Sequence, residues 1–541
     1  MKKTTVKTVA SVTLITALGF TGYLAANGAP PVAAAPNAAA VQKLDAQTHY
    51  SDEDLKWDSS DEEAIDLANP AAADGVNVNN GTITITADGT YRLSGEYNGQ
   101  VKIEAGKSDT VRLVLDNAKI TNSTGAAINV VSAAEAIIYT AAGTTNTVAD
   151  EANYTATGDD DPDAAIYSTA NLTLTGEGSL SVEGAYEEGI HTTGGLVIAS
   201  GTLEVNAANT GIKGKDYVDI TGGIVNVTAA QDGIKSTNTD DESMGFTRLS
   251  AGSVTVSAGD DGLKAPRTLE ISGGTLNIEK SNEGIEAQYI NILDGDVTVN
   301  STDDGINASL KDSSSDTSSD TTSGTATTGQ QTQQNQNGQV QQAPAGGGAA
   351  PGGSQGSTGQ NQNMPQPPTD GAMPGGGTFE VVDAAINISG GTVTVNAEGD
   401  GIDSNGTATF SGGTVTVNGP VSGGNNALDS NGDLLLNGGT VTTGSTADMF
   451  EAPSSASTSG YLKITDSSAL TQGSTVQVTD SSGTVVANYK ITTSGVQLVL
   501  VSNKNIVKGQ SYTVSVTSGS VDAASTTAAS GASELGSFTA A

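Results

Sequence analysis

Short runs of alternating apolar and polar residues recur along most of the chain. The phrases TGGIVNV from Thr221, SGGTLNI from Ser272 and SGGTVTV from both Ser389 and Ser411 place aliphatic or β-branched residues at every second position. Glycines interrupt these runs every few residues. Alternation with a period of two, punctuated by glycine, predicts short β-strands and excludes long helices. We therefore expect an all-β fold.

A second phrase joins a polar or acidic turn to a glycine and an aliphatic residue, and it repeats at a nearly constant spacing. Most steps, such as Gly189 to Gly211 and Gly211 to Gly233, are 22 residues long. A fixed period of this length, filled by strands, predicts a parallel β-helix of roughly a dozen coils. Each glycine should occupy a turn that a Cβ would strain. The aliphatic residues should form one inward column: Ile190, Ile212, Ile234, Leu263, Ile285, Ile306 and Ile402.

Changes in this pattern divide the chain into segments. Lys2, Lys3 and Lys7 precede an apolar stretch, which is typical of an export signal; a retained membrane anchor is the alternative. The protein is thus expected to be secreted or at the cell surface. A stretch rich in Ser, Thr, Gln, Gly and Pro predicts disorder. The expected segments are a signal peptide and linker (1–40), an N-terminal extension (41–74), the first part of the parallel β-helix (75–310), a disordered insertion (311–378), the last coils of the β-helix (379–452) and an antiparallel β cap (453–541).

Composition narrows the chemistry. The chain has 60 acidic and 22 basic residues, a net charge of −38, two His and no Cys. Thiolate chemistry and disulfides are therefore excluded, and so is binding of nucleic acid or anionic membranes by charge alone. Stacked carboxylates favour a bound cation instead.

The acidic turns are the candidate metal site. Carboxylates repeated one coil apart would repel each other unless they were protonated, paired with lysine or bridged by a metal. Calcium suits such oxygen-rich turns, although Asp before Gly is also ordinary turn chemistry. The candidate ligands are Asp232, Asp260, Asp261, Glu283, Asp303, Asp304, Asp400 and Asp403.

A further set of residues is considered for sugar contacts. Lys213, Lys235 and Lys264 each follow the inward aliphatic residue and either balance the acidic turns or form a cationic track for uronic acids. Tyr186 and Tyr217 would offer sugar-stacking faces, although tyrosine in strands usually packs internally.

Many of these phrases, in order, resemble a known family. The segments GTYRLSGEYNGQVKIEA, GIKGKDYVDITGGIVNV and DGIDSNGTATFSGGTVTV are similar to the bacterial carbohydrate-binding β-helix family, known from secreted clostridial proteins that bind cellulose and polygalacturonate. The similarity covers about residues 75–452. It implies a right-handed parallel β-helix with bound calcium and sugar binding without catalysis. Thr210 and Ala427 depart from the usual turn acid and glycine, which puts metal binding at those coils in doubt.

The sequence thus predicts a monomeric, non-catalytic protein that binds an acidic polysaccharide through calcium. One alternative is a polysaccharide lyase or hydrolase on the same fold. The hydrolase phrases Gly-His-Gly and Arg-Ile-Lys are missing, and a calcium lyase would need a base among Lys213, Lys235, Lys264, Arg248 and Arg267. The other alternative is a surface adhesin or spacer without a specific glycan.

Overall fold

The computed structural model describes residues 44–541 except 156, 157, 159, 160, 311–379, 466–469, 519, 520 and 523. The predicted signal peptide and disordered insertion lie outside the described residues. The described residues hold strands β1 to β40 and one short 3-10 turn, η1 (Ser59–Asp61), so the predicted all-β class is confirmed. None of the helical segments in this described part is long and apolar enough to cross a membrane.

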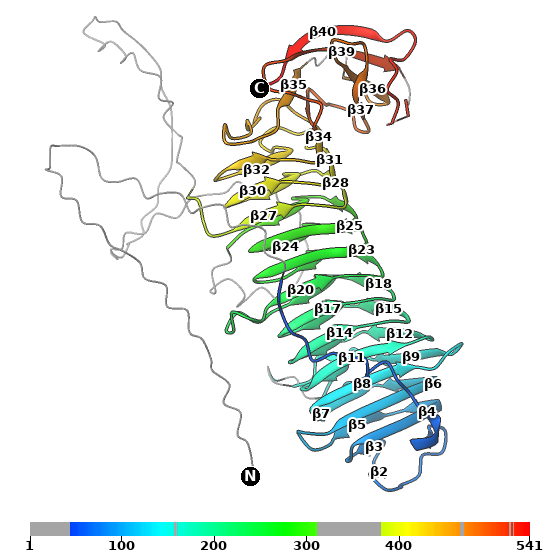
Figure 1. Cartoon of the computed structure of the whole chain (residues 1–541). Coiled ribbons are helices and arrows are strands. Elements are labelled where there is room, and N and C mark those ends of the chain that lie inside the picture. The colour runs from blue at the N-terminus through cyan, green and yellow to red at the C-terminus, as the bar shows by residue number, and fades with distance from the viewer. Residues whose placement is uncertain are drawn as a thin grey trace, which may run out of the picture. The chain divides into compact units, whose positions relative to one another are not determined.

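Each coil gives one short strand to a 13-stranded sheet and two strands to a 23-stranded sheet (Figure 1). The smaller sheet runs in the order β2 (Val76–Asn79), β3 (Thr82–Ile85), β5 (Gln100–Glu104), β7 (Ile128–Ser132), β10 (Ala164–Ser168), β13 (Glu188–Thr192), β16 (Ile212–Gly214), β19 (Ile234–Ser236), β22 (Leu263–Lys264), β24 (Ile285–Ala287), β26 (Ile306–Ala308), β29 (Ile402–Ser404) and β32 (Leu428–Ser430). From β3 onward its neighbours pair in parallel, which confirms the predicted parallel β-helix.

The larger sheet contains the other two strands of each coil. In chain order its strands are β1 (Glu62–Asp66), β4 (Gly89–Asn98), β6 (Thr110–Asn122), β8 (Glu135–Thr140), β9 (Thr145–Asp150), β11 (Asn171–Gly176), β12 (Ser179–Gly184), β14 (Gly195–Ile198), β15 (Thr202–Ala207), β17 (Tyr217–Ile220), β18 (Ile224–Ala229), β20 (Phe246–Leu249), β21 (Ser253–Ser257), β23 (Thr268–Ser281), β25 (Tyr289–Ser301), β27 (Ala385–Ile388), β28 (Thr392–Ala397), β30 (Thr407–Phe410), β31 (Thr414–Asn418), β33 (Leu434–Leu436), β34 (Thr440–Ser445), β35 (Tyr461–Thr465) and β38 (Leu498–Ser502). The two strands of one coil meet at a turn whose second glycine has a positive φ, such as Gly223 at 83°. A side chain with a Cβ is strained in that conformation, which explains the recurring Gly-Gly pair.

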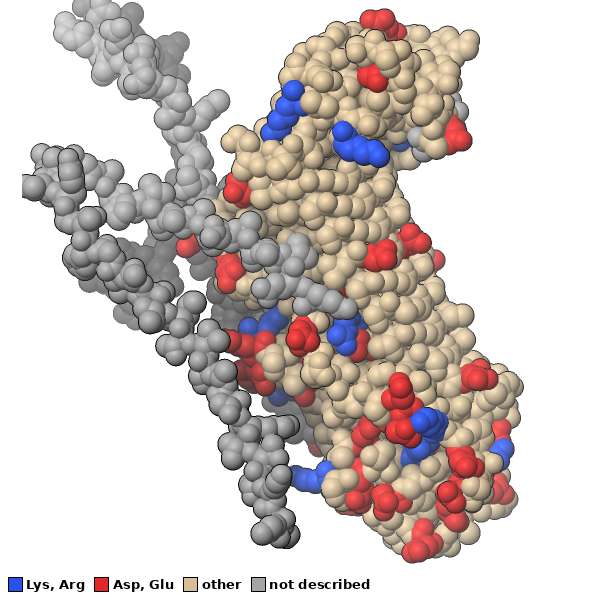
Figure 2. Space-filling model, viewed as in Figure 1, with Lys and Arg blue, Asp and Glu red and all other residues tan. Residues whose placement is uncertain are grey.

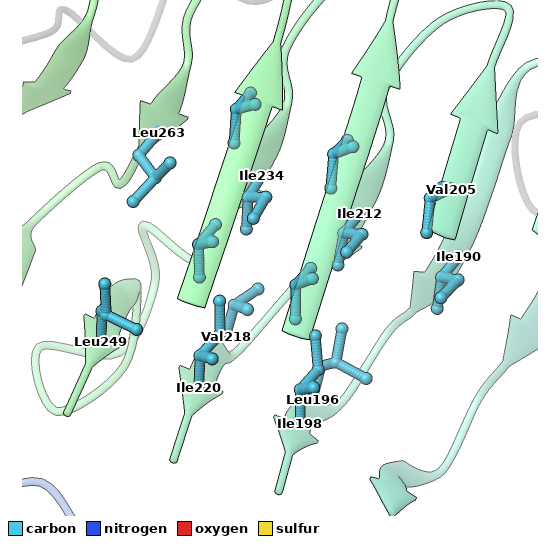
Figure 3. Packing of buried hydrophobic residues seen from close by; sticks show 14 of the residues in the cluster. Ile190, Leu196, Ile198, Val205, Ile212, Val218, Ile220, Ile234, Leu249 and Leu263 are labelled. Atoms are coloured by element: carbon cyan, nitrogen blue, oxygen red, sulfur yellow. The ribbon is translucent and has the colours of Figure 1, made fainter. Parts of the chain in front are cut away.

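The core is built from the predicted inward column. Ile190, Ile212, Ile234 and Leu263 are direct partners in successive strands and are at most 1% exposed. Figure 3 shows them facing Ile198 and other aliphatic side chains of the larger sheet. The column continues in register through Ile285, Ile306 and Ile402, as predicted. Successive coils thus bury identical aliphatic side chains without large aromatics.

The glycines that precede the inward aliphatic residues are needed because the next coil lies close to them, and not because of a special backbone conformation. Gly233 does not adopt a positive φ. A Cβ at this position would collide with Val256 Cγ1 and would lie 2.6 Å from the carbonyl oxygen of Gly262 in the next coil. The constraint is therefore the close approach of the following coil. Ala427 fits because β32, which follows it, is the last strand of the smaller sheet.

A C-terminal antiparallel unit follows the last coil, as predicted. β34 pairs antiparallel with β38, and β38 also pairs antiparallel with β35. A four-stranded antiparallel sheet adds β37 (Val485–Lys490), β36 (Ser474–Thr479), β39 (Ser511–Ser518) and β40 (Ser533–Thr539), in that order. This cap has its own hydrophobic cluster. It pairs with the last coil strand, which would otherwise be an open parallel edge.

At the other end, the N-terminal extension lies along the outside of the larger sheet. We call residues 44–57 the strap; Figure 1 shows it in dark blue, in front of the strands between β20 and β8. The backbone N–H of Leu44 donates to Glu270 at 2.6 Å, and that of His49 donates to the hydroxyl of Tyr217 at 2.8 Å. After the strap, β1 joins the sheet by pairing with β4.

Candidate functional site

Two columns of polar side chains run along the smaller sheet. Each strand of this sheet is only two to five residues long, so the repeated turn fixes which side chains point outward. The turn column contains the residues before the turn glycines: Glu188, Thr210, Asp232, Asp261, Glu283, Asp304, Asp400 and, before Ala427, Asn426. The outer column contains the residues after the inward aliphatic ones, paired in register: His191, Lys213, Lys235, Lys264, Glu286, Asn307, Asp403 and Asp429.

The outer column is basic in its first half. Lys213 lies 2.8 Å from Glu188, Lys235 lies 2.8 Å from Asp232, and Lys264 lies 2.6 Å from Asp261. The lysine side chains are only 18–23% exposed. Burial alone would lower the pKa of Lys213 and Lys264, but the adjacent carboxylates outweigh it and raise both pKa values. Lys213 and Lys264 are therefore held as cations, and all three lysines are paired with acidic turn residues.

At the last coils both columns are acidic, and we call this part the acidic half: Asp304 and Asp400 belong to its turn column, and Asp403 and Asp429 to its outer column. Burial raises the pKa of Asp304 and of Asp400 to about 6, and neighbouring carboxylates add to the shift. Burial likewise raises the pKa of Asp403 to about 7, and the charges that act on it are those of other carboxylates. Glu451 has its pKa raised to about 8 by burial and by Asp429. The last coils thus concentrate carboxyl groups whose ionisation is disfavoured by burial and by one another.

The backbone holds the acidic half in place. The N–H of Asp400 donates to Asp304 Oδ1 at 2.7 Å, and the N–H of Asn426 donates to Asp400 Oδ1. The N–H of Ser430 donates to Glu451 Oε2 at 2.8 Å. Asp304 and Asp400 are thus fixed by the coil that follows each of them, whereas Glu451 is fixed by the last strand of the smaller sheet, which precedes it.

Three groups in the described part of the chain bring possible metal ligands within 4.8 Å of one another. Asp232, Asp260 and Asp261 form one, and Glu283 joins Asp261 and Glu286 in the next. Carboxylate oxygens in these two groups match the ligand type that calcium prefers. The third group consists of Asp163, Glu188 and His191, with His191 Nδ1 only 2.6 Å from Asp163.

The structure adds site residues that the sequence did not single out as ligands. Glu286 and Asp429 stand at regular outer-column positions, so the repeat contained their signal. Asp163 precedes β10, the coil before the first clear acidic turn. Glu451 follows the last coil, where no repeat could reveal it. Among the predicted ligands, Asp303 adds negative charge beside Asp304.

The two candidate tyrosines differ in their surroundings. Tyr186 stacks on Tyr154 with ring centroids 4.0 Å apart, and part of its surface is exposed. Tyr217 is only 4% exposed, stacks on Phe246 and contacts His49 of the strap. Tyr217 therefore presents no open face to a sugar in this structure.

Charge is also unevenly distributed over the visible face of the larger sheet. Figure 2 shows acidic side chains gathered over the first coils, around β4, β6 and β8, and far fewer charges over the coils above them. The acidic character is thus concentrated locally, which is the condition for local cation binding.

Comparisons with known proteins find three similarities. Residues 79–341 match the model of a family described as carbohydrate-binding domain-containing protein. A protein of that description from Acetivibrio thermocellus is 36% identical over 145 residues, which cover 26% of this chain and 51% of the relative. The chain thus spans about half the length of this curated relative. A solved structure described as the polysaccharide lyase-like protein from C. thermocellum, gadolinium derivative, is 31% identical with a TM-score of 0.39, and the match covers 44% of this chain and 99% of that one. Residues 79–341 are therefore similar to the carbohydrate-binding domain-containing family.

Proposed function

We propose that this protein is a non-catalytic extracellular carbohydrate-binding protein that holds an acidic polysaccharide, such as polygalacturonate, through calcium. The similarity of residues 79–341 to a carbohydrate-binding family supports the polysaccharide partner. The observation that supports calcium is the acidic half, where Asp304 and Asp400 of the turn column and Asp403 of the outer column all have raised pKa values.

The physical argument rests on like-charge repulsion. Successive coils place carboxylates about 4.8 Å apart, and half-buried anions at that spacing repel each other strongly. Burial is the larger cause of the raised pKa values and this repulsion adds to it, so the site favours a proton over its own negative charge. Calcium relieves the same repulsion with two positive charges and accepts several carboxylate and carbonyl oxygens. An acidic glycan then completes the coordination and avoids direct contact with a chain of charge −38.

The lysine pairs favour the acidic half as the main calcium position. Asp232 and Asp261 already contact the ammonium groups of Lys235 and Lys264, so a metal there would have to displace a lysine. Burial is the main cause of the raised pKa values of Asp304, Asp400 and Asp403, and the charges that add to it are those of other carboxylates. The predicted ligands Asp260 and Glu283 lie where the lysine-paired half of the columns meets the acidic half, and we do not place the main calcium position there.

Lyase activity is the second candidate, and the electrostatics favour it less. A calcium lyase needs a neutral basic side chain beside the metal to remove a proton. The adjacent carboxylates raise the pKa of Lys213 and Lys264, which disfavours their neutral forms. Arg248 pairs with Asp219 at 2.6 Å beneath the strap, on the larger sheet. Binding without bond cleavage is therefore the proposed activity.

The test is calorimetric titration of the protein with polygalacturonate in calcium and in excess chelator. We expect binding in calcium and at least a tenfold loss in chelator. The double variant Asp400→Asn with Asp403→Asn should lose the calcium-dependent part, whereas Asp296→Asn, an exposed position on β25, should bind like the parent. Binding that is unchanged by chelator would overturn the calcium bridge. Release of unsaturated products, followed by ultraviolet absorbance, would instead establish a lyase.

A further inference from the structure

A groove of about 610 Å³ lies between the last coils and the C-terminal cap. One wall is formed by the ends of β23, β25, β28 and β31, and the other by Val421, Ser422 and the cap residues Thr492 and Thr493. Its volume is in the range of small-ligand sites. The groove is separate from the outer column, which belongs to the smaller sheet.

A ladder of three asparagines lines the groove. Asn300, Asn396 and Asn418 are direct partners in three successive strands of the larger sheet. The Nδ2 of Asn418 donates to Asn396 Oδ1 and the Nδ2 of Asn396 donates to Asn300 Oδ1, both at 2.9 Å. The Nδ2 of Asn300 donates to the carbonyl of Ile278 at 2.8 Å. All the hydrogen bonds run in one direction, which fixes the orientation of every amide.

The cap supplies the last member of this chain. The hydroxyl of Tyr489 donates to Asn418 Oδ1 at 3.0 Å. The partner of Asn418 in the next strand is Gly444, and a Cβ there would collide with the Tyr489 hydroxyl. The absence of a side chain at Gly444 therefore lets the cap tyrosine continue the ladder, and it ties the cap to the groove wall.

The asparagine side chains of the ladder do not use all their hydrogen-bond donors and acceptors on one another. An asparagine side chain has two N–H donors and two acceptor lone pairs on its oxygen. Asn300 and Asn396 each use one donor and one lone pair within the ladder, and both are only half-buried. One donor and one acceptor thus remain at each coil, next to the hydroxyl-bearing side chains of Thr302, Ser422 and Thr492.

We propose that this groove is a binding site for an uncharged, hydroxyl-rich glycan chain that runs along the helix axis. Paired donors and acceptors match sugar hydroxyls, which both donate and accept. The coil spacing of about 4.8 Å is close to the length of one β-1,4-linked pyranose residue. The charged lining residues are Glu279, Glu398 and Lys280, so the groove is not positively charged and favours a neutral glycan over a uronate.

This site goes beyond the proposed calcium-dependent function and does not require a metal. The test is titration of the full chain with cellohexaose in excess chelator, which removes the calcium-dependent mode. We expect measurable binding by the parent. Thr492→Trp fills the groove from an exposed cap position and should weaken binding at least tenfold. Asn396→Leu, which interrupts the ladder, should do the same.

The matched control is Thr513→Trp, an exposed threonine on β39 that does not line the groove. It should bind cellohexaose like the parent. Thr492→Trp should also keep its melting temperature and its calcium-dependent binding of polygalacturonate, so the two sites can fail separately. Absence of cellohexaose binding by the parent, or full binding by Thr492→Trp, would overturn the groove proposal and leave the calcium site unaffected.

Discussion

The ammonium of Lys264 lies 3.1 Å from the carboxylate of Glu286, which is its direct partner in the next coil. Lys264 also contacts Asp261 of its own coil at 2.6 Å. It is the last lysine before the outer column becomes acidic. This one side chain therefore separates the balanced half of the column from the half that accumulates negative charge.

Replacing Lys264 should destabilise the protein markedly. Lys264→Met leaves two buried carboxylates without their cation, and breaking a buried ion pair from one side costs about 3–5 kcal/mol. Thermal unfolding should show the loss as a lower melting temperature. Lys56→Met is the control: its pair with Glu53 is largely exposed, so the melting temperature should not change. Adding Glu286→Gln to Lys264→Met should recover part of the loss; if it recovers none, repulsion between the carboxylates is not the cause.

Calcium should stabilise the folded chain. A ligand that binds only the native state adds about 2.7 kcal/mol when its concentration is one hundred times the dissociation constant. We expect the melting temperature to rise with calcium and to fall back on chelation. Asp403→Asn should reduce the rise, whereas Asp296→Asn should keep it. An equal rise in both variants would show that the acidic half does not hold the ion.

The inward column allows a matched test of burial within one coil. Ile234 is fully buried, whereas Ile224 is 50% exposed. Ile234→Ala should cost about 2–5 kcal/mol, because the removed atoms leave a cavity between coils that cannot collapse. Ile224→Ala should cost much less. Chemical denaturation of both variants measures the difference, and equal costs would contradict the assignment of these two faces.

The sequence could predict this column because, in a stack of parallel coils, residues one repeat apart in the sequence become direct partners in neighbouring strands. Ile212 and Ile234 are 22 residues apart and become direct partners. The strap could not be predicted in the same way. Its contacts join residues such as Leu44 and Glu270, which no repeat relates, and they depend on side chains of the larger sheet. Glu451 was missed for the same reason.

The sequence predicted that the turn glycines could not carry a Cβ. The structure shows that the reason is the close approach of the next coil and not a positive φ. Gly233→Ala should destabilise because the new Cβ meets Val256 and the next coil, and such overpacking costs about 1–3 kcal/mol. Gly423→Ala is the control, since its Cβ would meet only Asp448 at 3.8 Å. The comparison is made by thermal unfolding. Equal melting temperatures would mean that adjacent coils separate at little cost.

The stability of the strap should depend on pH through His49 and Glu135, whose titrations act in opposite directions. The hydroxyl of Thr173 joins them: it lies 2.9 Å from His49 Nε2 and donates to Glu135 Oε1 at 2.8 Å. Burial lowers the pKa of His49 to about 4, and burial raises the pKa of Glu135 to about 7. The folded His49 thus resists protonation, and the folded Glu135 resists ionisation.

The two windows follow from these shifts. The unfolded histidine titrates near 6.5, so the stability contributed by neutral His49 is full above that pH and is lost as pH falls toward 4. The contribution of Glu135 is full below 4.5 and is lost as pH rises through 7. Between about 4.5 and 6.5 the two slopes oppose each other, and the parent should change little.

Separating the two groups tests this account. Glu135→Gln removes the second slope, so the strap of this variant should loosen steadily as pH falls from 6.5 to 4. His49→Asn should show the reverse, with loosening as pH rises from 4.5 to 7. Trp57, the only tryptophan of the chain, packs 5.5 Å from the ring of Tyr139 at the end of the strap and reports its release by fluorescence. Hydrogen exchange of residues 44–57 gives an independent measure. Identical pH profiles in the two variants would rule out His49 and Glu135 as the opposing groups, because each substitution removes only one of the two titrations.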